Sequence, residues 1–207
     1  MTLYTPRKAA MPVTPSVAAA LASVDEDYYT RCPDGNLLPQ TTSAQMIARM
    51  LDALDVRPGH RVLEIGTGSG FSGALLRELV GKTGHVVSLD VVANLVERAR
   101  TLHAKLGHSN IEVLVGDGVE GAPGYAPFDR IIAWASAERV SPAWIEQAVP
   151  GAVLVLPVEL APLVRTTAIV RLHTTPAGLP AADEVFEGGY VEMHAEELTQ
   201  WLVPPRG

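Results

Sequence analysis

The chain has 207 residues and a mass of 22.0 kDa, a length that suits one α/β domain with a sizeable core. Its formal net charge is −7 and its 16 Lys and Arg are dispersed, which argues against a nucleic-acid partner that would need a concentrated basic face. No apolar run reaches the length of a membrane span. A single cysteine, Cys32, excludes an intrachain disulfide and suits a reducing cytoplasm. We also expect a monomer.

Residues 1–42 are predicted to form an N-terminal arm and substrate-side loop, and residues 43–207 the main part of a single globular domain. Prolines punctuate the arm, which has one predicted helix near Val17 to Val24 and ends in the turn-rich "CPDGNLLPQ". Its apolar part superficially resembles a signal peptide, but Pro12 and Pro15 interrupt that part. We therefore interpret it as an arm folded over the domain.

After the arm, strands and helices alternate. The stretch "SAQMIARMLDALDV" has apolar residues at helical spacing and predicts a helix that begins at Ser43 and ends at "RPG". Further helices are predicted at 71–80, 93–106 and 142–148. Strands are predicted at 61–65, 86–90, 111–115, 130–134 and 153–158, with two late ones in "TTAIVRL" and "EVFEGGYVEM". This order predicts an α/β fold with a mainly parallel, seven-stranded sheet that has helices on both faces.

The glycine-rich turn in "RVLEIGTGSG" separates the first of these strands from the next helix. It lacks the lysine of a nucleotide-triphosphate loop, and the dinucleotide pattern G-x-G-x-x-G would need glycine where the chain has Phe71. The pattern is instead E-x-G-x-G-x-G, with Glu64 before the glycines. Glycines allow close approach of a ligand, and the carboxylate favours a cationic group over a pyrophosphate. A sulfonium nucleoside that carries an amino acid fits this pattern.

Two more acidic residues end the next strands. Asp90 could accept both ribose hydroxyls of a nucleoside, and Asp117 could accept a hydrogen bond from an adenine amino group. Each acidic residue also has a simpler interpretation: Glu64 could cap a neighbouring helix, Asp90 could be the N-cap of the helix at 93–106, and Asp117 with Gly118 is a common turn pair. The ordered combination favours a nucleoside site.

Several motifs together carry a family resemblance over about residues 38–158: "VLEIGTGSGF", "VVSLD", "VGDG", "FDRIIAWAS" and "PGAVLVLPV". They resemble the ordered motifs of class I S-adenosylmethionine-dependent methyltransferases, specifically the protein-L-isoaspartate O-methyltransferase family. The resemblance implies a Rossmann-like fold, S-adenosylmethionine as cofactor and S-adenosylhomocysteine as product. The cofactor-binding residues that it implies are Glu64, Gly66, Thr67, Gly68, Gly70, Asp90, Val91, Asp117 and Gly118.

The segment "LPQTTSAQ" is similar to the Gln-Thr-x-Ser segment of that family. The resemblance implies that Ser43 lies beside the transferred methyl group and the substrate carboxyl, with Thr42 as its catalytic partner. It also implies that Gln40, Trp134 and Ser136 contact the substrate. The residues alone identify Ser43 as a helix N-cap, and both roles stay open because a capping serine at a pocket mouth can also present its hydroxyl to a ligand.

The expected chemistry needs neither a metal nor a general base. The six histidines show no metal-binding spacing, and Cys32 has no motif that pairs it with a base. A substrate carboxylate, with a pKa of about 4, is already ionised near neutral pH. The enzyme would align its oxygen with the methyl carbon and sulfur, exclude water and remove part of the hydration of the carboxylate. Hydroxyl and amide donors at Thr42 and Ser43 suit that task.

Departures from the family pattern bear on the substrate. Trp134 and Glu138 stand where small residues followed by proline are usual and would reshape a peptide pocket; core packing is the rival interpretation for Trp134, and the favoured one for Trp144. The segments "FDRII" and "SPAWIEQ" resemble a branch encoded with ribosomally made peptide natural products.

We therefore expect a carboxyl O-methyltransferase acting on aspartate or isoaspartate in a peptide or protein, giving a methyl ester that can collapse to a succinimide. The departures slightly favour tailoring of a ribosomally made peptide. One alternative is general isoaspartyl protein repair, and another is a non-catalytic S-adenosylmethionine-binding regulatory module, against which the intact motifs weigh.

Overall fold

The computed structural model describes residues 13–39, 41–161, 166–175, 180–188, 190 and 193. The helices in this part of the chain are α1 (Pro15–Ser23), α2 (Glu26–Thr30), α3 (Ala44–Leu54), α4 (Phe71–Val80), α5 (Ala93–Lys105) and α6 (Pro142–Glu146), with a 3-10 turn, η1, at Pro123–Tyr125. The strands are β1 (Arg61–Ile65), β2 (His85–Asp90), β3 (Ile111–Val115), β4 (Phe128–Ala133), β5 (Ala148–Ala161), β6 (Thr166–Thr174) and β7 (Pro180–Glu187).

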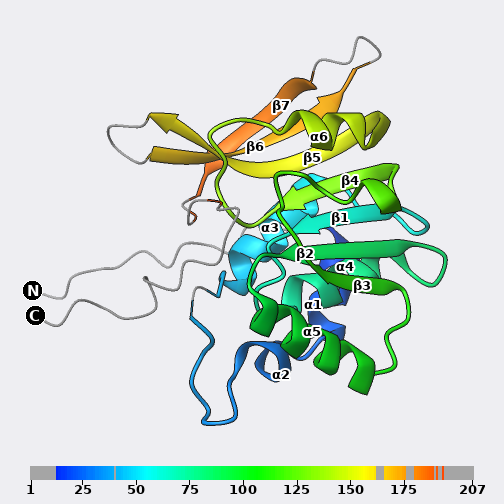
Figure 1. Ribbon diagram of the computed structural model, residues 1–207, viewed down its shortest axis with the longest axis vertical. Coiled ribbons are helices and arrows are strands. Elements are labelled where there is room, and N and C mark those ends of the chain that lie inside the picture. Colours follow the sequence, from blue (N-terminus) through cyan, green and yellow to red (C-terminus); the bar gives the residue numbers. More distant parts are fainter. Residues whose placement is uncertain are drawn as a thin grey trace, which may run out of the picture.

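The strands form one sheet in the order β3-β2-β1-β4-β5-β6-β7, which runs from the lower to the upper part of Figure 1. Strands β1 to β5 pair in parallel, and β6 and β7 are antiparallel to their neighbours. The predicted fold class, a mainly parallel sheet of seven strands, is confirmed. The carboxyl ends of β3, β2, β1 and β4 meet at one edge of this sheet, which is where open α/β sheets bind ligands.

The core lies on both faces of the sheet. Along β1, Val62 belongs to the core cluster that includes side chains of α1, α3 and α4, whereas Leu63 belongs to the cluster on the other face, which includes Trp144 of α6. This alternation is the period of two expected for a strand covered on both sides. Trp144 is 1% exposed, so the core interpretation for this residue is confirmed.

Several predicted boundaries were wrong. Strand β4 ends at Ala133, one residue before Trp134, and α6 ends at Glu146 because Ala148 already pairs with Phe128 as the start of β5. The last strand ends at Glu187 rather than continuing through the two glycines. Helix α2 was not predicted; Asp25 caps it by accepting a hydrogen bond from the Tyr28 N–H at 3.3 Å.

The described part of the arm packs against the domain. Val17 and Ala20 of α1 and Tyr29 of α2 are buried in the same cluster as α3 and α4. The boundary between arm and domain after residue 42 therefore stays a prediction, since these elements share one core. Among the described helices, none combines the length and apolarity that crossing a membrane would require.

Candidate functional site at the carboxyl edge of the sheet

The loop after β1 has the backbone that only glycine adopts readily. Gly66, Gly68 and Gly70 have φ values of 92°, 50° and 85°. The N–H groups of Gly66 and Thr67 both donate to the carbonyl of Leu89, at 2.7 and 3.0 Å, so the loop is attached to β2. A Cβ on Gly66 would lie 3.3 Å from the Cβ of Trp134, whereas one on Gly68 would meet nothing within 4 Å. The loop is closely packed at its start and open at Gly68.

Glu64 lies beneath this loop and is 0% exposed. Its Oε1 accepts hydrogen bonds from the Ser72 hydroxyl at 2.5 Å and the Trp134 indole N–H at 2.9 Å, and its Oε2 accepts one from Ser88 at 2.6 Å. Burial raises the pKa of Glu64, and these three donors offset part of that effect by stabilising the ionised form.

The side chains of Glu64 and Thr67 face the protein interior. The Thr67 hydroxyl lies 2.7 Å from that of Ser88 and is buried, so it continues the network under the loop. The expectation that the Glu64 carboxylate meets a cationic ligand directly is therefore corrected: it supports the loop from below. Ser88 was missed, although a serine within the apolar run "VVSLD" is a signal for a buried polar contact.

Asp90 ends β2 at the rim of the loop. Its Oδ2 accepts from the Gly68 N–H at 2.9 Å and its Oδ1 accepts from the Val92 N–H at 3.0 Å. A carboxylate offers roughly four acceptor positions, so these two bonds leave capacity for further donors. Val91 follows directly and is half-buried. The structure thus places Asp90 beside the open glycine, as the nucleoside interpretation requires. The simpler interpretation was wrong, because the N-cap of α5 is Val92 and no side chain caps that helix.

Asp117 and Gly118 follow β3 on the same edge. The Oδ1 atom of Asp117 accepts from the Val119 N–H at 2.9 Å, which is the turn that the simpler interpretation predicted. Gly118 is buried, and a Cβ there would lie 2.3 Å from the Ile65 Cγ2 atom, so the chain must pass close to the end of β1 at this point. Because β3, β2 and β1 are neighbours, Asp117, Asp90 and the glycine loop lie in a row.

Thr42 and Ser43 precede α3. Ser43 is exposed, and its Oγ accepts from the Met46 N–H at 3.4 Å, so it is the N-cap of α3. An accepting hydroxyl keeps its own proton, so Ser43 can still donate to a ligand. Thr42 directly precedes this cap and is half-buried. Gln40, the predicted substrate contact, lies outside the described residues.

Trp134 and Ser136 follow β4. Trp134 is 8% exposed and donates to Glu64, so the core interpretation accounts for much of its environment and its predicted substrate contact is limited to a small surface. Ser136 is buried, and its carbonyl accepts from the Met193 N–H at 2.8 Å. The Sδ atom of Met193 would lie 3.8 Å from a Cβ on Gly118. Met193 therefore lies at this edge of the sheet.

Two other residues at the edge were missed. Tyr190 lies with its ring centroid 6.4 Å from that of Trp134, and no local pattern in the sequence predicts this approach. Arg98 of α5 donates to the carbonyl of Ser69 at 3.0 Å and to that of Arg31 at 2.9 Å, so it links the glycine loop to the loop after α2. Among the described residues, no group of three or more His, Cys, Asp or Glu could hold a metal ion.

Solved structures show the same fold. One that bears the name protein-L-isoaspartate O-methyltransferase matches with a TM-score of 0.79 at 22% identity, over 88% of this chain and 62% of that one. A putative protein-L-isoaspartate O-methyltransferase from Plasmodium falciparum, solved in complex with S-adenosyl-L-homocysteine, matches with a TM-score of 0.71 at 19% identity, over 88% of this chain and 92% of that one.

Sequence comparison is more specific. A protein-L-isoaspartate O-methyltransferase from Ignicoccus hospitalis is 44% identical over 140 residues, 67% of this chain and 65% of that protein. Protein-L-isoaspartate O-methyltransferase 2 from Archaeoglobus fulgidus is 45% identical over 140 residues, 65% of this chain and 64% of that protein. The chain thus spans slightly less than two thirds of the length of these relatives. The model of the protein-L-isoaspartate(D-aspartate) O-methyltransferase family matches residues 5–180, and the chain belongs to this family.

Proposed function

We propose that the chain is an S-adenosylmethionine-dependent O-methyltransferase that acts on the side-chain carboxylate of an isoaspartyl residue in a peptide or protein. The observation that carries the proposal is the family match over residues 5–180, in a chain whose glycine loop is open at Gly68 beside the Asp90 carboxylate. Bound S-adenosylmethionine would supply the activated methyl group for the transfer.

The residues at the edge fit such a cofactor. Gly68 has room for a ligand against its backbone, and the acceptor capacity left on Asp90 suits the two hydroxyls of a ribose. Asp117 lies on the next strand end, where it could accept from an adenine amino group. Glu64, with Thr67, Ser72 and Ser88, holds the loop in place from below.

Where the methyl-accepting carboxylate of the substrate binds, the protein would supply hydrogen-bond donors and exclude water. The substrate carboxylate, with a reference pKa of about 4, needs no base, so the protein must orient it and remove part of its hydration. Ser43 presents an exposed hydroxyl whose proton is not used by the cap. Trp134 and Tyr190 provide apolar surface that would keep water from the reacting atoms.

The substrate is proposed to be isoaspartate in unstructured protein segments, as in repair. The relatives described above carry isoaspartate in their names, and tailoring of a ribosomally made peptide has no support among them. Trp134 had favoured tailoring because it would reshape the peptide pocket. Its burial and its bond to Glu64 weaken that argument.

The test is a mass-spectrometric methyl-transfer assay with S-adenosylmethionine and two matched unstructured peptides, one with isoaspartate and one with ordinary aspartate. We expect a gain of one methyl group on the isoaspartyl peptide alone. Transfer to ordinary aspartate would favour tailoring instead. Inactivity on both peptides, together with calorimetric binding of S-adenosylhomocysteine, would favour the non-catalytic module and contradict the proposal.

A further inference from the structure

Residues 31–38 form a short hairpin between α2 and the segment that leads to Ser43. Its two sides pair through an antiparallel bridge between Arg31 and Leu37. The Thr41 hydroxyl donates to the carbonyl of the last hairpin residue at 2.6 Å, so the hydrogen-bonded structure continues to within two positions of Ser43. The position of the hairpin therefore bears on the position of Ser43.

Packing contributes little to holding this hairpin on the domain, because Cys32 and Leu38 are half-buried and its other residues are exposed. In the described part of the chain, all hydrogen bonds and ion pairs of the hairpin but one stay within residues 27–41. The exception is the bond that Nη2 of Arg98 donates to the carbonyl of Arg31, at 2.9 Å. This bond is thus the polar contact that fixes the hairpin to α5.

The same guanidinium also holds the glycine loop, because its Nη1 donates to the carbonyl of Ser69 at 3.0 Å. Arginine suits a link between two carbonyls, since its five N–H donors are fixed in one plane and its charge strengthens each bond. The helix that carries it packs directly on the loop: a Cβ on Gly70 would lie 3.1 Å from the Cβ of Ala99. Arg98 therefore projects from a helix that is itself held against the loop.

The two segments differ in how they are otherwise held. The N–H groups of Gly66, Thr67 and Gly68 all donate to acceptors on β2, so the glycine loop has several attachments besides the one to Arg98. For the hairpin, the described residues offer the Arg98 bond alone as a hydrogen bond to the body of the domain. Losing Arg98 should therefore free the hairpin and leave the loop in place.

We infer that Arg98 is a positioning residue for methyl transfer: it ties the hairpin at 31–38, and through it Ser43, to the loop that is proposed to hold S-adenosylmethionine. The inference rests on the proposed function, in which Ser43 donates to the acceptor carboxylate. Because one guanidinium joins the two segments, a cofactor that fixes the glycine loop also fixes the hairpin. Arg98 acts through these two segments and is not itself a catalytic residue.

The test measures hydrogen exchange in wild type, Arg98→Met and Arg100→Met, each with and without S-adenosylhomocysteine. Arg100 is the matched control because it lies on the same helix and donates from Nε to the Val113 carbonyl at 2.6 Å, which ties α5 to β3 and not to the hairpin. In Arg98→Met we expect faster exchange of the amides at 31–38 and no slowing there when S-adenosylhomocysteine is added. Wild type and Arg100→Met should both show the slowing.

Activity provides a second measurement. With an isoaspartyl peptide, kcat of Arg98→Met should fall by roughly tenfold, the effect of one lost charge-assisted hydrogen bond, while the Kd for S-adenosylhomocysteine stays within about threefold. Arg100→Met should keep the kcat of the wild type. A role confined to the fold would instead lower the melting temperature of both variants and leave kcat of the folded protein unchanged.

Three results would overturn the inference: equal exchange at 31–38 in Arg98→Met and wild type, protection by S-adenosylhomocysteine that persists in Arg98→Met, or an unchanged kcat. Failure of the proposed function is a separate result, since the wild-type chain would then methylate no peptide. Exchange without ligand decides in that case whether Arg98 fixes the hairpin, faster exchange supporting it and unchanged exchange refuting it.

Discussion

The two ends of β4 carry buried polar side chains of different kinds. At the amino end, Arg130 is 8% exposed; just beyond the carboxyl end, Trp134 is equally buried and donates to the Glu64 carboxylate. At the amino end, arginine side chains donate hydrogen bonds to carbonyl groups. At the carboxyl end, neutral side chains donate hydrogen bonds to one carboxylate. Comparing the two ends separates polar contacts that only stabilise the fold from those that also shape a binding site.

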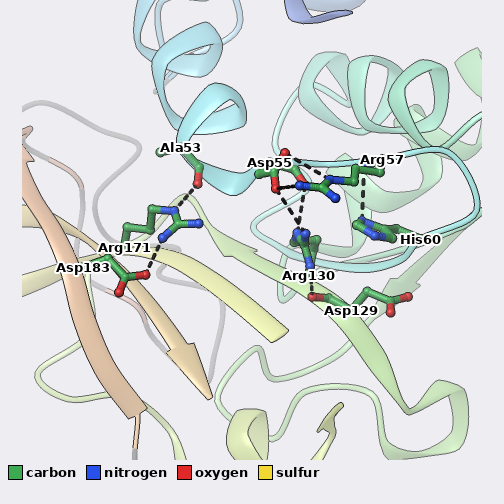
Figure 2. A network of polar contacts seen from close by, with 8 residues as sticks. All are labelled: Ala53, Asp55, Arg57, His60, Asp129, Arg130, Arg171 and Asp183. Atoms are coloured by element: carbon green, nitrogen blue, oxygen red, sulfur yellow. Dashed lines mark hydrogen bonds and ion pairs between the residues drawn. The ribbon is translucent and has the colours of Figure 1, made fainter. Parts of the chain in front are cut away.

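At the amino end, the polar contacts are directed at the last turn of α3 (Figure 2). Arg130 donates from Nε to the carbonyl of Asp55 at 3.0 Å, and Arg171 donates from Nε to the carbonyl of Ala53 at 2.7 Å. Arg171 also pairs with Asp183. Cations at these carbonyls are favourable because the last carbonyls of a helix lack partners within it and carry partial negative charge.

The charges of this network satisfy one another. Burial by itself would raise the pKa of Asp55, but the hydrogen bond and charge of Arg57, followed by the charges of Arg130 and Arg171, lower it overall. A cavity of about 320 Å³ adjoins the network and is lined by Arg49, Asp52, Ala53, Asp55, Arg171, Glu184 and Phe186. Since Arg49 already stacks on Phe186, 4.1 Å from the ring centroid, and Arg171 is bound on both sides, this end reads as structural.

At the carboxyl end, a carboxylate can still accept further hydrogen bonds. Asp90 uses two of its roughly four acceptor positions on the backbone, and Gly68 beside it is open. The lesson of the comparison is that the number of polar groups does not mark the binding site, because the amino end has more charged ones. The binding site is marked by hydrogen-bond acceptors without a partner that lie next to accessible backbone.

The largest effect is expected from Asp90→Ala. The variant should lose two charge-assisted bonds to a bound ribose, each roughly 1.5 to 3 kcal/mol, and should weaken binding of S-adenosylhomocysteine by at least about a hundredfold in titration calorimetry. It should also loosen the loop, since the Gly68 N–H loses its acceptor. The control is Asp183→Ala, which removes a carboxylate from the other network. Equal affinities in wild type and Asp90→Ala would remove the ribose assignment.

At the amino end of β4 we expect a smaller effect, which is on stability and not on cofactor affinity. Arg130→Met keeps the length of the side chain but removes its bonds to the carbonyls of Asp55 and Asp129, at 3.0 and 2.8 Å. We expect the free energy of unfolding in urea to fall by about 2 to 3 kcal/mol, the typical value of hydrogen bonds to a charged group. Cofactor affinity of the folded protein should stay the same. A loss of affinity without a loss of stability would contradict the conclusion that the amino end of β4 only stabilises the fold.

The next effect concerns pH. Because burial raises the pKa of Glu64, the folded protein binds a proton there more tightly than the unfolded chain does. The contribution of Glu64 to stability is therefore fully present below its ordinary pKa of 4.5 and is lost as the pH rises through the pKa of the folded state. In Glu64→Gln this decrease should be absent, because the amide does not titrate. Urea midpoints between pH 4 and 9 measure it, with the surface variant Glu184→Gln as control. Parallel pH profiles for wild type and Glu64→Gln would contradict this account.

The sequence predicted the sheet edge well and the contacts across it poorly. Strand β1 and helix α4 were predicted with their observed bounds, because the strand residues Val62, Leu63 and Ile65 are apolar and the glycines that follow separate the strand from the helix. Asp90 was found at the end of β2 because it directly follows the apolar run of that strand. The direction of the Glu64 side chain could not be read from the motif, since it depends on Ser88 and Trp134, 24 and 70 residues away. Tyr190 shows the same limit, because it reaches Met50 across 140 residues.

The smallest effect on stability is expected from Ser43→Ala, which should nevertheless lower kcat. As an N-cap, Ser43 accepts a long bond of 3.4 Å from the Met46 N–H and is exposed, so its loss should cost about 0.5 to 1 kcal/mol in thermal or urea unfolding. The matched control is Asp25→Ala, which removes the exposed N-cap of α2 with its 3.3 Å bond to the Tyr28 N–H. Both variants should lose similar stability.

Only Ser43→Ala should lower kcat, because its hydroxyl proton is available to the acceptor carboxylate, whereas Asp25 is not a residue of the proposed site. If both variants lose activity in proportion to stability, Ser43 is only a cap. The carboxyl end of the sheet would then resemble the amino end in holding a helix terminus in place, and the donors to the substrate would have to be backbone N–H groups.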